Sequence, residues 1–122
     1  MKILGVDFGS KRIGLAWSDT TLGVVLPFGV AKTIPELIQL AEEEKVDKIV
    51  IGFPVGLNGT ENKNTERVKK VAFEIQKATG LTVEFFDERF TSQAADAAGA
   101  GVSRDEKSAM IILEGYLESS KH

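Results

Sequence analysis

Acidic residues stand at the ends of predicted structural elements at three places in this sequence. Asp7 ends the first apolar strand, Asp87 or Glu88 ends the last one, and Asp105 lies in the first turn of the final predicted helix. If the first and last strands are neighbours, their ends lie together, and a helix packed across the sheet can bring Asp105 to the same edge. Oxygen ligands without histidine or cysteine favour Mg²⁺ or Mn²⁺ over zinc. The pattern therefore predicts a site for one of these cations.

A cluster of carboxylates implies a cation, because like charges held close together raise each other's pKa and a divalent ion removes that penalty. Two such ions about 3.5–4 Å apart can activate a water on one side of a phosphodiester and stabilise the leaving oxygen on the other. Taken singly, each acid also has a structural explanation. Asp7 could bond its own backbone in a turn, and Asp105 could complement a helix dipole. Asp87 or Glu88 could cap the strand end or pair with Arg89.

The composition fits a single domain over residues 1–122, without disulfides. The chain has no cysteine, and its single histidine, His122, cannot support a histidine-based triad. The apolar run after Lys2 meets Asp7 too early for a signal peptide, and no segment approaches the roughly 18 apolar residues of a membrane-spanning helix. We therefore expect a soluble, cytoplasmic protein with no membrane partner. The net charge of −3 argues against coating nucleic acid by bulk charge but allows a local basic face.

Hydrophobic periodicity predicts an α/β fold. Strands are predicted at residues 3–7, 12–17, 24–32, 48–53 and 82–86. Helices are predicted at residues 35–44, 62–78 and 104–117. The first three strands have short links and form an antiparallel meander, whereas the others follow helices and should run parallel to their neighbours. The sequence therefore predicts a mixed five-stranded sheet with helices on its faces.

Local signals mark the element boundaries. Thr33 followed by Glu36 has the form of a capping box, and so does Ser103 followed by Glu106. Gly80 is placed as the residue that ends the second helix. A turn at Gly9 should join the first two strands, and the third strand should bend near Pro27 and Gly29.

Polar and basic residues follow the fourth strand. Asn58 lies in the loop after it, where open α/β sheets place ligands. Lys63, Arg67 and Lys70 then recur at helical spacing and predict a basic stripe for nucleic acid. The alternative is that Glu66 and Lys70 form an ordinary pair four positions apart.

The motifs of the chain resemble those of the YqgF/RuvX family, whose members are named as pre-16S rRNA nucleases and as RuvC-like Holliday junction resolvases. The matching segments, in order, are 7–14 (DFGSKRIG) with Ser18 and Asp19 after it, 52–54 (GFP) with Asn58 and Gly59, 87–92 (DERFTS) and 111–117 (IILEGYL). They cover nearly the whole chain.

The resemblance implies an RNase H-like fold and a metal-dependent phosphodiesterase site. By position in the motifs, Asp7 would be the metal ligand on the first strand. Glu88, or else Asp87, would be the second ligand, because adjacent strand residues face opposite sides of a sheet. Asp105 would be the acid of the C-terminal helix.

The resemblance also implies that Lys11, Arg12 and Arg89 contact phosphate. The chain departs from the family between Ser92 and Asp105, where the family has a longer helix and loop. Residues 93–101 of this chain form a short segment rich in alanine and glycine. Its glycines weaken a helix there, so we expect a mobile link.

The first functional hypothesis is a nuclease that hydrolyses structured RNA, acting on the 5′ end of pre-16S rRNA and on ribosomal precursor particles as the resemblance suggests. The alternative is a Holliday junction resolvase that cuts branched DNA with the same site. Cutting two strands symmetrically needs two active sites, so a homodimer would favour DNA and a monomer would favour RNA.

Other functional classes fit the sequence less well. An actin-like or sugar-kinase-like fold also carries an Asp-x-Gly-Ser motif, but it encloses ATP between two domains and this chain is too short for two. A non-catalytic nucleic-acid-binding module would not need the acids, all of which are present. We expect that Asp7→Asn separates this last possibility from a nuclease.

Overall fold

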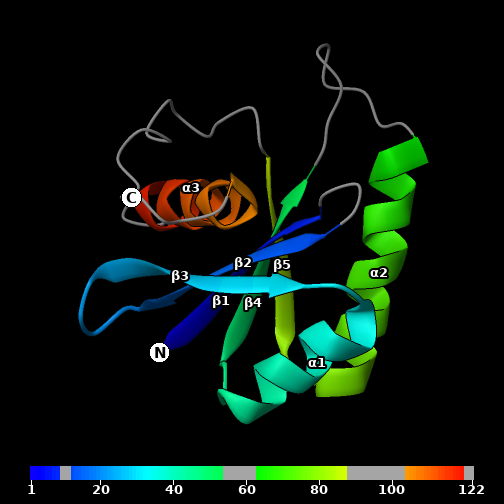
Figure 1. The fold of residues 1–122 in the computed structure, drawn as a ribbon, viewed down its shortest axis with the longest axis horizontal. Helices are drawn as coiled ribbons and strands as arrows, with labels where there is room; N and C mark the ends of the chain where they lie inside the picture. The colour runs from blue at the N-terminus through cyan, green and yellow to red at the C-terminus, as the bar shows by residue number, and fades with distance from the viewer. Residues whose placement is uncertain (9–11, 54–62, 88–103, 120–122) are drawn as a thin grey trace.

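The computed structural model describes residues 1–8, 12–53, 63–87 and 104–119, which build one sheet with helices on both faces (Figure 1). The strands are β1 (Lys2–Phe8), β2 (Ile13–Asp19), β3 (Val24–Ala31), β4 (Lys48–Phe53) and β5 (Thr82–Asp87). The helices are α1 (Ile34–Glu43), α2 (Lys63–Thr79) and α3 (Arg104–Ser119). Across these described ranges, no helix combines the length and the apolar character needed to cross a bilayer.

The sheet is mixed, as predicted. Its spatial order is β3-β2-β1-β4-β5, with an antiparallel meander on one side and parallel strands on the other. β4 is an unbroken apolar run because it has a strand on each side and helices over both faces. Ile49, Val50 and Ile51 are accordingly fully buried.

The first and last strands are not neighbours, because β4 lies between β1 and β5. The hairpin with β2 occupies one edge of β1, so the crossover through α1 adds β4 to the other edge, and β5 joins the outer edge of β4. The parallel register nevertheless keeps the strand ends level, since Val6 pairs with Ile51 and Ile51 pairs with Phe85.

The third strand bends where the sequence contains a proline and a glycine. Leu15 of β2 pairs with Gly29. The next residue, Ala16, pairs with Pro27, so Phe28 is the extra residue of a bulge. Gly29 has a φ of 119°, which side chains rarely tolerate. The predicted bend is confirmed.

The helix boundaries follow the predicted signals to within one residue for α1 and α2. The Thr33 hydroxyl accepts a hydrogen bond from the Glu36 amide at 3.2 Å, and the Glu36 carboxylate accepts one from the Lys32 amide at 3.2 Å. Gly80 has a φ of 73° and its amide donates to the Gln76 carbonyl at 2.8 Å. The expected features outside the described residues are the turn at Gly9, the loop after β4, the segment 93–101 and the Ser103 cap.

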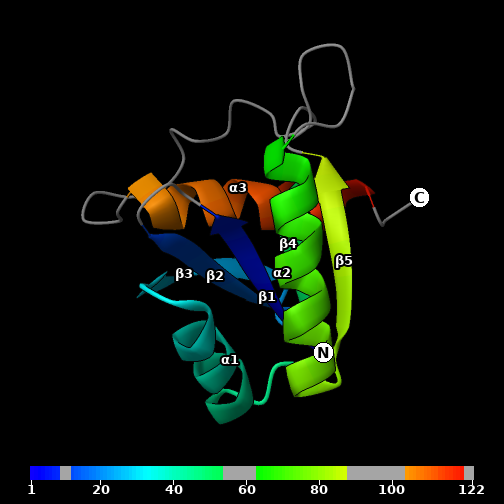
Figure 2. The same cartoon turned by 90° about the vertical axis from the view of Figure 1, so that its right-hand side faces the viewer.

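The described helices divide between the two faces of the sheet. α1 and α2 cover one face and α3 crosses the other (Figures 1 and 2). Leu4 and Val6 of β1 pack into the core beneath α1 and α2, whereas Ile3 packs with Leu113 of α3. Odd-numbered residues of β1 therefore face α3, and even-numbered residues face the other two helices.

Glycines let α3 approach the sheet closely. A Cβ atom on Gly14 of β2 would lie 2.0 Å from the carbonyl oxygen of Asp105. A Cβ atom on Gly5 of β1 would lie 3.1 Å from the carbonyl oxygen of Ala109. Any side chain at Gly14 would collide with helix backbone, so this residue determines how closely the first turn of α3 approaches the sheet.

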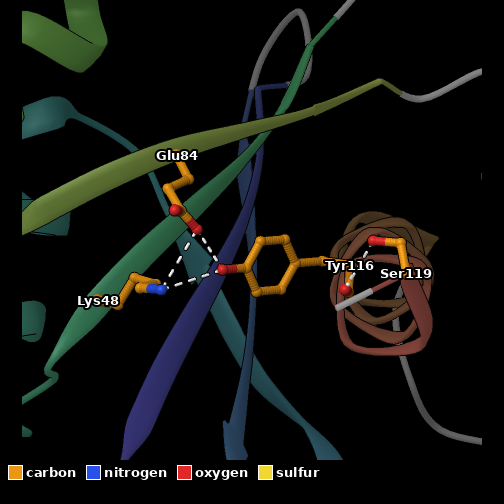
Figure 3. A network of polar contacts seen from close by, with 4 residues as sticks. All are labelled: Lys48, Glu84, Tyr116 and Ser119. Atoms are coloured by element: carbon orange, nitrogen blue, oxygen red, sulfur yellow. Dashed lines mark hydrogen bonds and ion pairs between the residues drawn. The ribbon is translucent and has the colours of Figure 1, made fainter. Parts of the chain in front are cut away.

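A polar network holds the other end of α3 (Figure 3). The Tyr116 hydroxyl donates to the Glu84 carboxylate and accepts from the Lys48 ammonium at 3.1 Å. Lys48 and Glu84 also form an ion pair at 3.3 Å. Beside this network, a Cβ atom on Gly115 would lie 2.8 Å from the Phe86 ring. The end of α3 is therefore joined to both β4 and β5.

The network shifts the pKa of each member. The hydrogen bond from Tyr116 lowers the pKa of Glu84, and the hydrogen bond with Tyr116 raises the pKa of Lys48. Burial raises the pKa of Tyr116 above its ordinary value of 10.0. The contribution of Glu84 to stability is therefore lost as the pH falls below its ordinary value of 4.5. The contributions of Tyr116 and Lys48 are lost as the pH rises above about 10.

Gly14→Ala is expected to lower the free energy of unfolding by about 3 kcal/mol, the upper end of the range for overpacking. The added methyl group would meet backbone, so the first turn of α3 has to move. Urea denaturation monitored by circular dichroism measures the change.

Ser18→Ala is the matched control for Gly14→Ala. Ser18 lies on the same strand, is fully buried, and its hydroxyl has no hydrogen-bond partner in the described part of the chain. Replacing it adds no atoms and should be neutral or slightly stabilising. Equal stability of Gly14→Ala and the native protein would contradict the close approach of α3.

Tyr116→Phe is expected to reduce the free energy of unfolding at pH 7 by about 1 kcal/mol, because it removes hydrogen bonds of the network. The difference from the native protein should shrink as the pH falls below 4.5, where Glu84 takes up a proton. Denaturant titrations at a series of pH values measure this difference.

Ser119→Ala serves as the control for the network. It removes an exposed hydrogen bond of 2.9 Å from the Ser119 hydroxyl to the Tyr116 carbonyl, at the same end of α3. Its effect should be small and independent of acid pH. A Tyr116→Phe difference that stays constant from pH 7 to pH 3 would show that Glu84 is not coupled to the tyrosine.

Candidate active site

Asp7 lies one residue before the end of β1, on the face of the sheet that α3 covers. It continues the odd-numbered set of Ile3 and Gly5, which contact α3. Its partner directly across the ladder in β2 is Gly14. Opposite residues in an antiparallel pair point to the same face, so the Asp7 carboxylate and the open side of Gly14 face the same way. Asp7 is half-buried there.

Asp105 reaches the same place from α3. It is the second residue of that helix, and its carbonyl oxygen is the atom that Gly14 approaches. Gly14 therefore lies between the two acids, with Asp7 beside it in the sheet and Asp105 above it. The Asp105 side chain is 28% exposed, so it is open to a ligand without being fully hydrated. The structure brings these two predicted residues together.

Arg12 borders this pair of acids. It directly precedes β2, and its Nε lies 3.5 Å from the Asp105 carboxylate. The Arg12 side chain is 60% exposed, so solvent screens the ion pair strongly. The guanidinium group is therefore accessible to an anion that approaches this edge.

The other predicted site residues either lie away from this pair of acids, are described by their backbone alone, or lie outside the described residues. Those outside are Lys11, Asn58, Glu88 and Arg89. Asp87 ends β5 and Lys63 begins α2, and only their backbone is described. Arg67 is exposed on α2, which covers the face of the sheet away from α3. Within the described ranges, no group of three or more acidic, histidine or cysteine side chains gathers closely enough to hold a metal ion.

Sequence reasoning did not identify Gly14 as a residue of the site. The signal was present, because a glycine inside an apolar strand often marks a place where another backbone approaches. In the sequence, Gly14 is the last residue of the motif at 7–14. Its role becomes visible when the distance to Asp105 is known.

A family model described as RuvX, Holliday junction resolvase, matches residues 1–119. The chain belongs to the RuvX family. The resemblance read from its motifs is thereby confirmed.

Curated relatives match over nearly the full length. A protein from Agathobacter rectalis named "Putative pre-16S rRNA nuclease" is 38% identical, and the alignment covers 97% of this chain and 95% of the relative. A protein of the same name from Clostridioides difficile is 39% identical over 96% of this chain and 94% of the relative. The first alignment runs over 136 positions, so that relative carries residues that the 122-residue RuvX chain lacks.

Solved structures show the fold. Thermus thermophilus RuvC in complex with a Holliday junction substrate superposes with a TM-score of 0.73 at 12% identity, covering 99% of this chain and 95% of RuvC. A second RuvC structure from the same organism gives a TM-score of 0.61 at 13% identity. RuvC has an RNase H-like fold, so that predicted fold class is confirmed.

Arg12→Ala is expected to change the free energy of unfolding by less than about 1 kcal/mol, because exposed ion pairs contribute little. Urea denaturation measures this change. Glu44→Ala is a matched control, since it breaks the surface ion pair of 3.2 Å between Lys2 and Glu44 at the opposite end of β1. A loss of more than about 2 kcal/mol for Arg12→Ala alone would show that Arg12 is structural and unavailable to a ligand.

Proposed function

We propose that this RuvX protein is a divalent-metal-dependent nuclease that hydrolyses phosphodiester bonds in precursor 16S rRNA. The observation that carries the proposal is the meeting of Asp7 and Asp105 around Gly14. Both acids are half-buried at one edge of the sheet, where two carboxylates held close together would repel each other and a bound cation would relieve that repulsion. Membership of the RuvX family and the names of the curated relatives support nuclease activity.

The proposed metal ligands fit a hard cation. Asp7 and Asp105 offer carboxylate oxygens, and the chain has no cysteine that would select a softer metal. Mg²⁺ or Mn²⁺ bound there would lower the pKa of a water and neutralise charge on the phosphate. Gly14 ties the first turn of α3 to β2, so it holds the backbone of Asp105 beside the strand pair that carries Asp7.

The third ligand in this proposal is Glu88, with Asp87 as the alternative. Even-numbered residues of β5 face α3, since Glu84 bonds to Tyr116 and Phe86 packs against Gly115. Side chains alternate along a strand with a period of two, so the same alternation favours Glu88 for the face that Asp7 shares. The side chains of Asp87 and Glu88 lie outside the described part of the structure.

We propose that polar and basic side chains contact the nucleic acid. The residues proposed for this role are Lys11, Arg12, Asn58, Lys63, Arg67 and Arg89. Arg67 lies on α2, over the other face of the sheet. Arg12 has the clearest role, because it lies beside Asp105 and is largely exposed. Its planar guanidinium can donate two hydrogen bonds to one phosphate while the carboxylates hold the cation.

The RNA substrate follows from the names of the curated relatives, and ribosomal precursor particles in the cytoplasm would then be the partner. A second candidate is cleavage of four-way DNA junctions, which the description of the family model favours. The RNA reaction can proceed on a monomer, whereas paired cuts in a junction require the two sites of a homodimer.

Asp7→Asn is expected to abolish metal-dependent cleavage, because the amide removes a negative charge from the cation site. The measurement compares cleavage of labelled precursor 16S rRNA and of a four-way DNA junction, each with Mn²⁺ and with EDTA. We expect cleavage of the RNA by the native protein with Mn²⁺, none with EDTA, and a loss of at least about a hundredfold in the variant, in line with losses from other polar active-site groups.

Glu42→Gln is the matched control, because it makes the same change of charge on an exposed residue of α1, away from the site. It should cleave at the native rate. Unchanged cleavage by Asp7→Asn would remove Asp7 from the mechanism. Cleavage of the junction with no cleavage of the RNA would show that the substrate is branched DNA and not precursor 16S rRNA.

A further inference from the structure

A groove runs between α2 and β5, which lie side by side in Figure 2. It has a volume of about 190 Å³ and is lined by Lys69, Ala72, Phe73, Gln76, Val83 and Phe85. Val83 packs into the core beneath α1 and α2, so the groove opens on the face of the sheet away from Asp7. Sites for whole small molecules measure about 300–1,000 Å³, so this groove suits one part of a larger ligand.

The groove exposes two aromatic rings. Phe73 on α2 is 66% exposed and Phe85 on β5 is 41% exposed. Large apolar side chains exposed together usually mark a binding surface, whereas single ones are common on any protein. The two rings lie on different elements and line the same groove, so a flat ligand can contact both.

Three lysines lie on the same side of α2 as Phe73. Lys69 and Lys70 precede it by four and three positions, and Lys77 follows it by four, so all three share its side of the helix. All three are exposed. Glu74 is adjacent in sequence, and neighbouring helical residues do not face the same way. Glu66 lies seven positions before Phe73, so this side of the helix carries three lysines and one acid. The surface around the groove therefore combines aromatic rings with positive charge.

We infer that the groove between α2 and β5 is a binding site for single-stranded RNA, in which Phe73 and Phe85 stack against unpaired bases and the lysines contact phosphates. Aromatic side chains beside lysines are the usual means of holding single-stranded nucleic acid, since every base has a face that can stack. An apolar protein segment would gain no binding energy from these lysines. The inference rests on the proposed function, because it places a second part of the same substrate.

The groove lies within reach of a strand that passes the candidate active site. The carboxyl ends of β1, β4 and β5 point to the same edge because these strands are parallel. Phe85 is two residues from the end of β5, about 7 Å along the strand, and β5 lies two strand spacings, about 10 Å, from β1. An RNA strand cut beside Asp7 can therefore pass around the β5 edge and place its unpaired continuation in the groove.

The test measures the affinity of a short fluorescein-labelled oligouridine by fluorescence anisotropy in EDTA, where no cleavage occurs. Phe73→Ala is expected to weaken binding about tenfold, the loss associated with one stacked base. Phe73→Trp should restore native affinity because it keeps a stacking surface. Lys69→Ala should weaken binding and reduce its dependence on salt.

Leu22→Ala is the matched control, since Leu22 is 67% exposed, is apolar, and lies in the turn between β2 and β3. It should bind as the native protein does. Native affinity in Phe73→Ala, or no binding by the native protein, would overturn the inference. A change in sedimentation of Phe73→Ala without a change in affinity would assign the groove to a second protein copy instead.

The experiments can contradict the catalytic site and the RNA-binding groove independently of each other. Asp7→Asn should bind oligouridine normally in EDTA, because Asp7 lies on the other face of the sheet from the groove. If Asp7→Asn loses cleavage and Phe73→Ala keeps native affinity, the proposed RNA-binding role of the groove is contradicted and the proposed catalytic site is not. Native cleavage in Asp7→Asn with weakened binding in Phe73→Ala would overturn the catalytic site alone.

Discussion

The contact between the backbone of α3 and Gly14 of β2 is the constraint on which the candidate site depends. A helix that carries side chains on every turn normally stands away from a sheet by the thickness of those side chains. Here the missing side chain of Gly14 lets the carbonyl of Asp105 approach the strand directly. Because Asp7 pairs with Gly14, the same contact sets the position of Asp105 relative to Asp7. An acid on the first strand and an acid nearly a hundred residues later become neighbours through one residue that has no side chain.

Further contacts along α3 hold the helix in one position on the sheet. Because Gly5 has no side chain, the middle of α3 can approach β1 closely. Apolar residues of the helix such as Ile112 and Leu113 are buried against β1 and β4. At the far end, Tyr116 is held by Glu84 and Lys48. A helix fixed at both ends cannot swing about Gly14, so its first turn keeps its position. The polar network therefore supports the candidate site from the opposite end of the sheet, without touching any of its residues.

The sequence allowed the fold to be predicted well, because most of its signals are local. Strand periodicity, the Thr33 cap and the Pro27 bend each act within a few residues, and each prediction is confirmed. The order of the strands could not be predicted, since no local pattern states which edge of β1 receives the next strand. For the site, the sequence pointed to Asp7 and Asp105 but not to Gly14, because the importance of that glycine lies in a contact between distant segments. The role of Glu88 stays a prediction.

The charge of the chain also explains why binding has to be local. With a net charge of −3, the protein as a whole does not attract a polyanion, and its acids at the edge of the sheet repel one. A divalent cation held by Asp7 and Asp105 would neutralise their two negative charges at the point of reaction. Away from that point, attraction has to come from clusters of basic residues, and α2 supplies one around Phe73. A nucleic acid would then be drawn to two places on opposite faces of the sheet, and a path between them passes β5, the outermost strand on that side. This geometry favours a flexible single strand over a stiff duplex at the groove, because the path requires a sharp turn.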